Sequence, residues 1–457
     1  MKKTRSGPSG QSALSAGLLL LLALVAPLAV QSQEAQIQTG TRTGVVGVKL
    51  AVPEFQPSAQ DEKSVGLTRV FNQVLWDDLD YSGVVTLVSR SFYPLGQFSA
   101  PAQINPDNWT TSAVDAQFIS FGNTRTGGGT FVVEARLWDL KNPQNREVFG
   151  TRFAGPDTED LARLVAHQLA DEIVQRIGGG IRGVSQTKLA FVTDRTNSGN
   201  KELFVMDYDG NNAFPLTAHR TIILTPAWSP DGEKIAFTSY RRNNPDLEII
   251  SRIDHSELPF QRSAGLTTTP SWSPDGARIA FASSRDSNDG PEIYVADWNG
   301  RNSRRVTQSR GVDISPVWNP RTGRELAFVS DRSGTPQIYI MDAEGTDVRR
   351  IIQDGGSAQN PSWSPDGQNI AFAWQKRGLP FDLYLYNLAT ASIVQLTRDA
   401  GDNERPTWAP DGLHLAFESS RNGTRQIYSM LADGTKLRQL TRSGKNESPA
   451  WSGYIGK

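Results

Sequence analysis

The sequence contains no cysteine and only four histidines among its 457 residues. Without cysteine there can be no disulfide, no thiolate nucleophile and no lipidated cysteine, so the fold must be held by its packed core. The histidines, His167, His219, His255 and His414, stand in no metal-ligand spacing and beside no paired carboxylate motif. No nucleophile elbow and no phosphate-binding loop is present. We therefore expect no enzymatic activity, no metal and no cofactor.

Excess charge of either sign is also missing. The chain holds 47 Lys and Arg against 48 Asp and Glu, which gives a formal net charge of −1. A protein that binds nucleic acid or an anionic membrane surface by charge carries a basic excess, so neither is expected as a partner.

Long apolar runs are confined to the N-terminus. Three cations, Lys2, Lys3 and Arg5, precede an almost pure run of Leu and Ala at 18–26, and small residues follow before Gln33. This order predicts a cleaved secretory signal peptide at residues 1–32. A membrane anchor is the alternative, but a span needs about 20 apolar residues. We expect no membrane insertion after cleavage.

A short motif recurs in the second half of the chain. It reads PSWSPDG at residues 361–367, and related copies surround six tryptophans that lie 43 to 46 residues apart: Trp228, Trp272, Trp318, Trp363, Trp408 and Trp451. A fixed period of this length indicates a propeller or a solenoid. Each complete copy is followed by an apolar triplet, such as Ile370-Ala371-Phe372, and by two further short β-type runs. Four short strands per repeat are typical of propeller blades.

The two ends of the repeat array complement each other. The triplet that begins at Leu189 has no tryptophan strand before it, and Trp451 has no repeat after it. We therefore predict that the strand around Trp451 completes the first blade, so that residues 187–457 form a six-bladed all-β propeller without an open edge between its first and last blades.

The preceding segment, residues 45–180, predicts a small α/β domain. Its strand patterns lie at 48–52, 84–88, 114–121, 131–139 and 147–152, and its helical patterns at 60–79 and 158–177. Asp157 or Thr158 is the expected cap of the second helix. Residues 33–44 are polar and rich in Thr, Gln and Gly, and we expect them to be flexible.

Several features recur in every repeat and favour a structural role. A cation follows each strand phenylalanine by four residues, at Arg195, Arg241, Arg285, Arg332, Lys376 and Arg421. A ring of positive charge is the functional alternative, but we interpret these residues as one anchor per blade. The tryptophans are expected to pack in the core rather than stack on sugars. The recurring Asp-Gly pairs are interpreted as turns, with calcium binding as the alternative.

The segments just before the tryptophan strands differ between repeats. Because these segments enter their blades from one face, around the central channel, a rigid scaffold presents them together as a binding surface. The candidate partner-binding residues are Leu266, Thr267, Thr268, Thr269, Asp313, Ile314, Ser315, Gln359, Asn360, Asn403, Glu404, Arg405, Asn446 and Glu447.

The signal peptide, the α/β domain, the W-S-P-D-G repeats and the closing Pro449-Ala450-Trp451-Ser452 together resemble the TolB family, periplasmic propeller proteins of the Tol-Pal system. The resemblance implies a monomeric periplasmic binding protein without catalysis. It implies a Pal-like peptidoglycan-associated lipoprotein as the partner of the segments before Trp272 and Trp318. It also implies a TolA-like inner-membrane partner for residues 33–44, and a role in outer-membrane constriction and integrity. A periplasmic propeller hydrolase or a glycan-binding propeller is the alternative.

Overall fold

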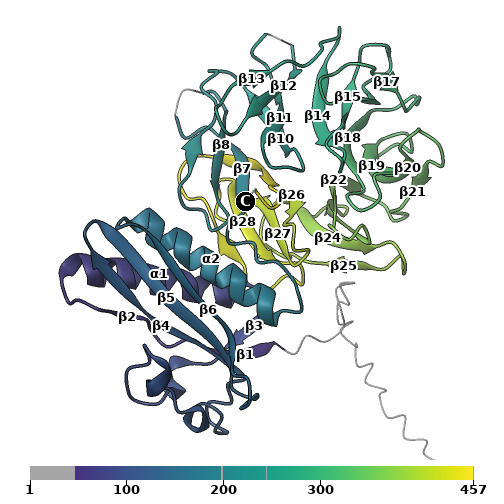
Figure 1. The fold of residues 1–457 in the computed structure, drawn as a ribbon. Coiled ribbons are helices and arrows are strands. Elements are labelled where there is room, and N and C mark those ends of the chain that lie inside the picture. The colour runs from purple at the N-terminus through teal and green to yellow at the C-terminus, as the bar shows by residue number, and fades with distance from the viewer. Residues whose placement is uncertain (1–46, 197–198, 243, 456–457) are drawn as a thin grey trace, which may run out of the picture. The chain divides into compact units, whose positions relative to one another are not determined.

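The computed structural model describes residues 47–196, 199–242 and 244–455. The predicted signal peptide and the segment 33–44 therefore lie outside the described residues. All described residues belong to one compact unit, which spans residues 38–457. They form a mixed sheet with two long helices and six four-stranded sheets (Figure 1). None of the helices in this described part is long and apolar enough to cross a membrane.

The N-terminal sheet is mixed, with the strand order β3-β1-β4-β5-β6 and with β2 paired to β4. Strand β1 pairs in parallel with β3 and β4, whereas β4, β5 and β6 form an antiparallel meander. The strands are β1 (Val48–Ala51), β2 (Gln56–Pro57), β3 (Val85–Leu87), β4 (Phe118–Gly127), β5 (Thr130–Asp139) and β6 (Glu147–Pro156). The predicted α/β fold is confirmed.

Strand β4 differs from its predicted range, 114–121. The N–H groups of Val114 and Asp115 both donate to the carbonyl of Thr111, at 3.2 and 2.7 Å, and Asp115 has a φ of +46°. This turn uses the residues that the prediction had assigned to the strand. The strand begins at Phe118 and continues to Gly127, where a glycine turn leads into β5.

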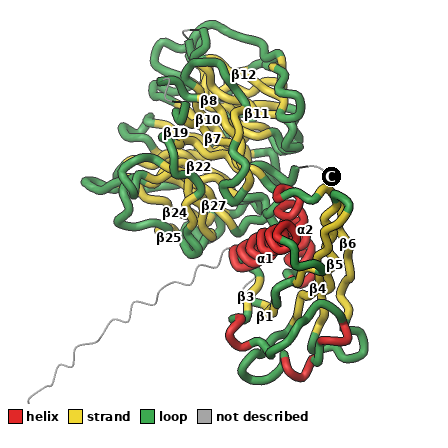
Figure 2. Tube along the Cα trace, turned by 90° about the vertical axis from the view of Figure 1, so that its left-hand side faces the viewer, coloured by secondary structure: helices red, strands yellow, loops and turns green. Residues whose placement is uncertain are grey.

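Two helices cover one face of this sheet (Figure 2). Helix α1 (Glu62–Tyr81) is capped by Asp61, whose carboxylate accepts from the N–H of Ser64 at 3.0 Å. Helix α2 (Glu159–Ile177) is capped as predicted by Thr158, whose hydroxyl accepts from the N–H of Leu161 at 3.3 Å. Leu75 and Leu169 are fully buried between the helices and the strands, which is the apolar core that makes the domain stable.

The segment between β3 and β4 builds a second, smaller core around Trp109, which is fully buried with Ile119 and Phe121 of β4. This segment contains three short 3₁₀ helices, η1 (Arg90–Phe92), η2 (Pro101–Gln103) and η3 (Pro106–Asn108). Proline begins both η2 and η3, where its missing N–H leaves no helical hydrogen bond unmade.

Six antiparallel blades follow in the described chain. Blade 1 contains β30 (Asn446–Trp451), β7 (Lys188–Thr193), β8 (Glu202–Asp207) and β9 (Phe214–Pro215). Blades 2 and 3 contain β10 (Ile223–Trp228), β11 (Lys234–Ser239), β12 (Asp246–Ser251) and β13 (Glu257–Leu258), then β14 (Thr267–Trp272), β15 (Arg278–Ser283), β16 (Glu292–Asp297) and β17 (Arg304–Arg305). Blade 4 contains β18 (Asp313–Trp318), β19 (Glu325–Ser330), β20 (Gln337–Asp342) and β21 (Arg349–Arg350). Blade 5 contains β22 (Ser357–Trp363), β23 (Asn369–Gln375), β24 (Phe381–Asn387) and β25 (Ile393–Gln395), and blade 6 contains β26 (Asn403–Trp408), β27 (His414–Ser419), β28 (Gln426–Leu431) and β29 (Arg438–Gln439).

The predicted closure is confirmed, because β30 pairs with β7 and Trp451 lies opposite Leu189. The six-bladed propeller and its all-β character are confirmed with it. Helix α2 ends at Ile177 and β7 begins at Lys188. The predicted domain limits at 180 and 187 lie between these elements and stay predictions.

Four of the six motif tryptophans connect neighbouring blades through their indole N–H. The indole N–H of Trp363 donates to the carbonyl of Val317 at 3.2 Å, and Trp228, Trp272 and Trp408 make the equivalent bond at 3.0–3.1 Å. Trp451 donates instead to the hydroxyl of Thr187 at 2.8 Å. All six rings are at most 9% exposed, so their predicted core packing is confirmed.

Tight turns that contain proline and glycine follow the first strand of blades 2 to 6, and in blades 2, 3 and 5 they read Ser-Pro-Asp-Gly. In blade 5 the Asp366 carboxylate accepts from the Ser364 hydroxyl at 2.5 Å and from the N–H of Gln368 at 3.0 Å, while Gly367 has a φ of +70°. The carboxylate is thus used by its own turn, and glycine supplies the left-handed backbone. We call this end of the blades the turn face.

Helix α1 contacts the turn face through its last turn. The Tyr81 hydroxyl donates to Ser429 at 2.7 Å, and Nε2 of His414 lies 2.8 Å from the Tyr81 carbonyl. A carbonyl only accepts, so Nε2 carries a proton. Nδ1 lies 2.6 Å from the Asp411 carboxylate, which stabilises the imidazolium. Burial acts to lower the pKa of His414, but Asp411 and these hydrogen bonds outweigh it and the pKa is raised.

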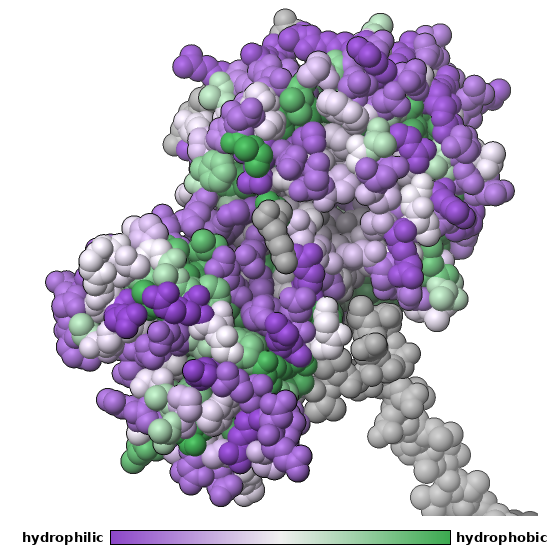
Figure 3. Space-filling view, viewed as in Figure 1, coloured by the Kyte–Doolittle hydropathy of each residue, from purple (hydrophilic) through white to green (hydrophobic). Residues whose placement is uncertain are grey.

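Side chains on the face shown in Figure 3 are mainly hydrophilic, and apolar residues occur there in small groups.

Candidate partner-binding site

The innermost strand of every blade carries a bulge close to its start. In β10, Thr225 and Pro226 together oppose a single residue of β11, and the same register shift occurs in β14, β18, β22, β26 and β30. A proline has no N–H to contribute to the ladder, so it is tolerated at a bulge. The proline of each tryptophan motif therefore marks the position of the bulge.

The residue before each proline has a left-handed backbone although it is not glycine. These bulge residues are Thr225, Thr269, Ser315, Asn360, Arg405 and Ser448, with φ between +49° and +54°. Such a conformation is uncommon outside glycine and is unfavourable for threonine, so it persists only where the surroundings enforce it. The six residues surround one end of the central channel, which we call the mouth.

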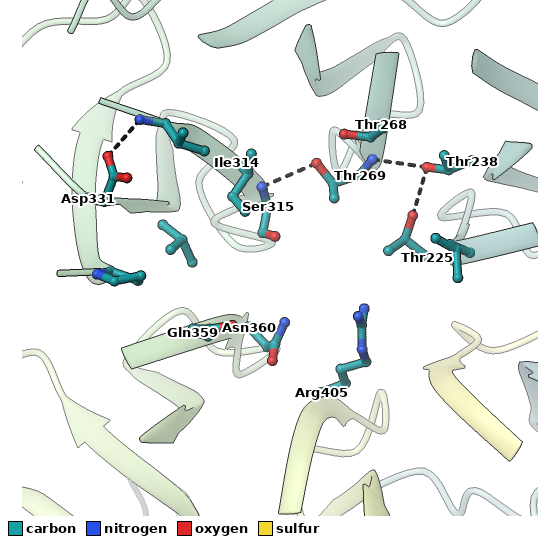
Figure 4. Close-up of a pocket in the computed structure, with 14 residues that line it drawn as sticks. Thr225, Thr238, Thr268, Thr269, Ile314, Ser315, Asp331, Gln359, Asn360 and Arg405 are labelled. Carbon is teal, nitrogen blue, oxygen red and sulfur yellow. Dashed lines mark hydrogen bonds between the residues drawn. The ribbon is translucent and has the colours of Figure 1, made fainter. Parts of the chain in front are cut away.

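Hydrogen bonds between blades hold the bulge residues in place (Figure 4). The N–H of Thr269 donates to the Thr238 hydroxyl at 3.1 Å, and the N–H of Ser315 donates to the Thr269 hydroxyl at 3.2 Å. On the other side of the mouth the N–H of Ser448 donates to the Glu418 carboxylate at 2.7 Å. These bonds join blades 2, 3 and 4, and blades 6 and 1. The rim is consequently cross-linked along blades 2 to 4 and between blades 6 and 1, which makes these parts of the mouth preformed.

A cavity of about 340 Å³ opens at the mouth. Its lining residues are Leu224, Thr225, Thr238, Thr268, Thr269, Val312, Ile314, Ser315, Val329, Asp331, Pro336, Gln359, Asn360 and Arg405. The lining comes from blades 2 to 6, and Figure 4 shows Asn360 and Arg405 directed into the open space. The cavity is large enough to receive one or two side chains of a partner.

The mouth has two chemically different sides. The side formed by blades 2 to 4 presents Leu224, Val312, Ile314 and Val329 with threonines between them, and we call it the apolar arc. Its one acid in the lining is Asp331, whose carboxylate accepts from the N–H of Val312 at 2.7 Å. The opposite side, from blades 6 and 1, is charged and consists of Lys201, Glu404, Arg405, Glu418, Arg425, Lys445 and Glu447, which we call the charged arc.

The charged arc is organised around two acids. Glu418 contacts Arg425, and burial raises the pKa of this carboxyl even though Arg405 and Arg425 oppose the rise. Glu447 lies 2.6 Å from the ammonium of Lys445 and also contacts Lys201. Burial acts to raise the pKa of Glu447, but the two lysines outweigh it and the pKa is lowered.

Seven of the residues predicted from the sequence line the cavity: Thr268, Thr269, Ile314, Ser315, Gln359, Asn360 and Arg405. Glu404 and Glu447 lie in the charged arc, and Leu266 is partly buried at the approach to β14. The remaining four, Thr267, Asp313, Asn403 and Asn446, are at most 2% exposed. A partner cannot reach these four side chains, so we do not retain them in the contact surface.

Three of the buried residues serve the cation of their own blade. Arg332 donates to Asp313 at 2.7 Å, Arg421 donates to Asn403 at 3.0 Å, and Arg195 donates to Asn446 at 3.1 Å. The same cations lie over aromatic rings; the Arg332 guanidinium, for example, is 5.1 Å from the ring centre of Tyr339. The interpretation of one anchor per blade is confirmed for these blades. Arg241 differs, because it pairs with Glu257 at 2.5 Å.

Sequence reasoning missed the part of the lining that blade 2 provides. Leu224 and Thr225 occupy the same offset before Trp228 as the predicted residues do before the later tryptophans, so the spacing alone could have found them. Thr238, Val329 and Pro336 come from second strands or the loops after them, where no sequence signal marks them. In the described ranges, no group of three or more His, Asp or Glu side chains could hold a metal ion.

Known proteins match the chain over both of its parts. A model of the TolB amino-terminal domain matches residues 39–146, and a model of the TolB beta propeller domain matches residues 175–379 and 353–455. The chain belongs to the TolB family. The Tol-Pal system protein TolB of Bordetella pertussis is 36% identical over 321 residues, which cover 70% of this chain and 68% of the relative. The Protein TolB homolog of Chlorobium chlorochromatii is 29% identical over 304 residues, or 64% and 63% of the two chains.

The fold is similar to a solved TolB structure as well. The crystal structure of TolB from Acinetobacter baumannii superposes with a TM-score of 0.74 at 25% identity, and the match covers 89% of this chain and 97% of that one. Membership of the TolB family confirms that the protein is not an enzyme, and the interpretation as a propeller hydrolase is set aside.

Proposed function

We propose that this TolB-family protein is a periplasmic, monomeric scaffold of the Tol-Pal system that binds a Pal-like peptidoglycan-associated lipoprotein at the mouth of its propeller. A TolA-like inner-membrane protein would bind residues 33–44. By holding both partners the protein would support outer-membrane constriction during division and the integrity of the envelope. Family membership and the names of the relatives, which are Tol-Pal system proteins, support this assignment.

The observation that carries the lipoprotein site is the hydrogen-bonded mouth with its cavity of about 340 Å³. Binding to a preformed surface requires little ordering of the receptor, which favours affinity. The mouth also lies away from the turn face, where helix α1 makes its contacts through Ser429 and His414. A partner at the mouth therefore does not compete with the α/β domain for the same surface.

The test is steric blockage of the cavity. Ile314→Arg and Thr269→Arg each place a long side chain in the mouth, and binding of the purified soluble domain of the lipoprotein is measured by calorimetry. Gln368→Arg is the matched control, because Gln368 is exposed on the turn face of blade 5. We expect the two mouth variants to lose binding and the control to keep it.

Melting temperatures of all three variants show whether each propeller is intact. Equal loss of binding at both faces, with unchanged melting, would mean that the lipoprotein site lies elsewhere. Retention of peptidoglycan fragments by the mouth in the absence of any lipoprotein binding would support a glycan-binding propeller instead.

A further inference from the structure

Arg405 differs from the other bulge residues of the mouth. Thr225, Thr269, Ser315 and Ser448 are short and neutral, and Asn360 is neutral as well, although all share the left-handed backbone. Arg405 is thus the one charged side chain among these six positions. It lines the cavity and points into its open space (Figure 4).

The guanidinium of Arg405 is weakly paired. In the described chain its polar contact is the approach of Nε to Glu418 Oε2 at 3.6 Å, and 36% of the Arg405 side chain remains exposed. Glu418 is itself 3% exposed, contacts Arg425 and accepts from the N–H of Ser448 at 2.7 Å. Because Glu418 is already satisfied, most of the hydrogen-bonding capacity of Arg405 is left for a ligand.

The donors of a guanidinium form a planar fork that matches the two oxygens of a carboxylate. A carboxylate that entered the cavity would lose water and would need such a cation beside it. A doubly charged phosphate fits the mouth less well, because Glu404 and Glu418 stand next to Arg405. These acids repel a singly charged carboxylate less than a phosphate, so the carboxylate is the anion that fits better beside Arg405.

The apolar arc faces this cation across the cavity. Ile314 and Leu224 are partly exposed there, so a partner gains free energy by covering them with an apolar side chain. We propose that the mouth recognises a partner segment in which an Asp or Glu side chain lies next to an apolar side chain, and that Arg405 is the specificity-determining residue that binds the carboxylate. This inference rests on the proposed function, because it names the chemistry of the partner at that same site.

The test measures the Kd of the purified soluble domain of the peptidoglycan-associated lipoprotein for the intact protein and for Arg405→Gln, at low and at high salt. Truncating one partner of a charge pair in a partly desolvated site weakens binding by about tenfold or more. Arg405→Lys keeps the charge but loses the planar fork of donors, so its Kd should lie between that of the intact protein and that of Arg405→Gln. Arg398→Gln is the matched control, because Arg398 is an exposed cation in the loop between β25 and β26. The Kd of Arg398→Gln should stay within about twofold of that of the intact protein, because an isolated exposed cation contributes little to binding.

The carboxylate is identified by changing the surface Asp and Glu residues of the lipoprotein to their amides, one at a time. We expect one amide variant to weaken binding as much as Arg405→Gln does. When that variant is combined with Arg405→Gln, binding should weaken no further, because the two changes remove the same direct interaction. Arg405→Lys, which keeps the charge beside Glu418, should melt like the intact protein, and Arg405→Gln should melt only slightly earlier, because Arg425 and Ser448 still contact Glu418.

Three results would overturn the inference. If Arg405→Gln binds within twofold of the intact protein while Ile314→Arg does not bind, the proposed function stands and the role of Arg405 is wrong. If Arg405→Gln weakens binding but no partner carboxylate is coupled to it, Arg405 does not bind a carboxylate. If the intact protein fails to bind the lipoprotein at all, the proposed function and this inference fall together.

Discussion

The indole hydrogen bonds between blades can be tested within this one molecule, because the indole of Trp318 makes no hydrogen bond to a described residue. Trp363 and Trp318 are 5% and 4% exposed, so their substitution by Phe removes a similar buried volume. Trp363 donates to the Val317 carbonyl at 3.2 Å. The Trp318 N–H is buried and has no hydrogen-bond partner among the described residues. The comparison therefore isolates the hydrogen bond from the packing.

The expected difference follows from the two environments. Trp363→Phe loses a hydrogen bond that contributes about 1 kcal/mol and leaves a carbonyl without that donor. Trp318→Phe removes an N–H whose unsatisfied burial costs about 1–3 kcal/mol. Trp318 also stacks with Arg278, whose guanidinium lies 4.7 Å from the ring centre, but a phenyl ring keeps part of that interaction. We expect Trp363→Phe to lower the free energy of unfolding by about 2 kcal/mol more than Trp318→Phe does.

Equilibrium unfolding in urea, followed by far-UV circular dichroism, measures the difference as a shift in midpoint at unchanged slope. Leu379→Ala is the control for a change without loss of core packing, because the Leu379 side chain is 56% exposed. Equal losses for the two tryptophan variants, or a larger loss for Trp318→Phe, would refute the idea that the indole bonds stabilise the ring.

Three further predictions follow from the closure, the buried histidines and the N-terminal segment. Deleting residues 449–457 should unpair β7 and lower the melting temperature, and a truncated protein that melts like the intact one would contradict the closure. The Asp78 carboxylate lies 2.6 Å from Nδ1 of the buried His167, as Asp411 does from His414. These carboxylates outweigh burial and raise the pKa of both histidines above the ordinary 6.5, so the stability that the two ion pairs contribute is complete below about pH 6.5 and is lost as the pH rises through the folded-state pKa values. The double variant His167→Gln/His414→Gln should flatten this decline in urea melts recorded from pH 5 to 9, and an undiminished decline would assign it to other groups. Deleting residues 33–43 should abolish binding of the TolA-like partner while lipoprotein binding and the melting temperature stay unchanged; retained binding of the TolA-like partner would leave these residues as a spacer.

The blades were predictable from the sequence because their signals are local and repeat. A tryptophan, a turn that contains proline and glycine, and an apolar triplet seven or eight residues after the tryptophan recur in five copies, so one irregular copy does not obscure the repeat. Strand β2 was not predictable, since it consists of Gln56 and Pro57 alone and exists only through its pairing with β4. The turn before β4 was not predicted, because residues 114–121 alternate between apolar and polar side chains, and this alternation is typical of a strand.

The site was predictable only in outline. The segments before each tryptophan were identified by their variation, but a residue before proline is expected to be extended, so the left-handed bulge at Thr225 or Thr269 has no sequence signal. Polar residues such as Asp313 and Asn403 are usually exposed, and their burial depends on an arginine that folds back onto them from the loop after the second strand. Such partners are separated along the chain and meet only in the folded blade.

The pairing of β30 with β7 also determines when the propeller can finish folding. Trp451 and its hydrogen-bond partner Thr187 are separated by 264 residues, whereas the strands within each of the other blades are joined by short loops. Contacts between residues so far apart form slowly, because the entropy of closing the intervening loop is lost before the contact stabilises the chain. Blades 2 to 6 can each form as soon as their own strands are present, but blade 1 must wait for the last strand of the ring. Until then β7 presents an unpaired edge that another chain could occupy. A slow final folding phase, and a tendency of unfinished molecules to associate through blade 1, are the kinetic consequences of this closure.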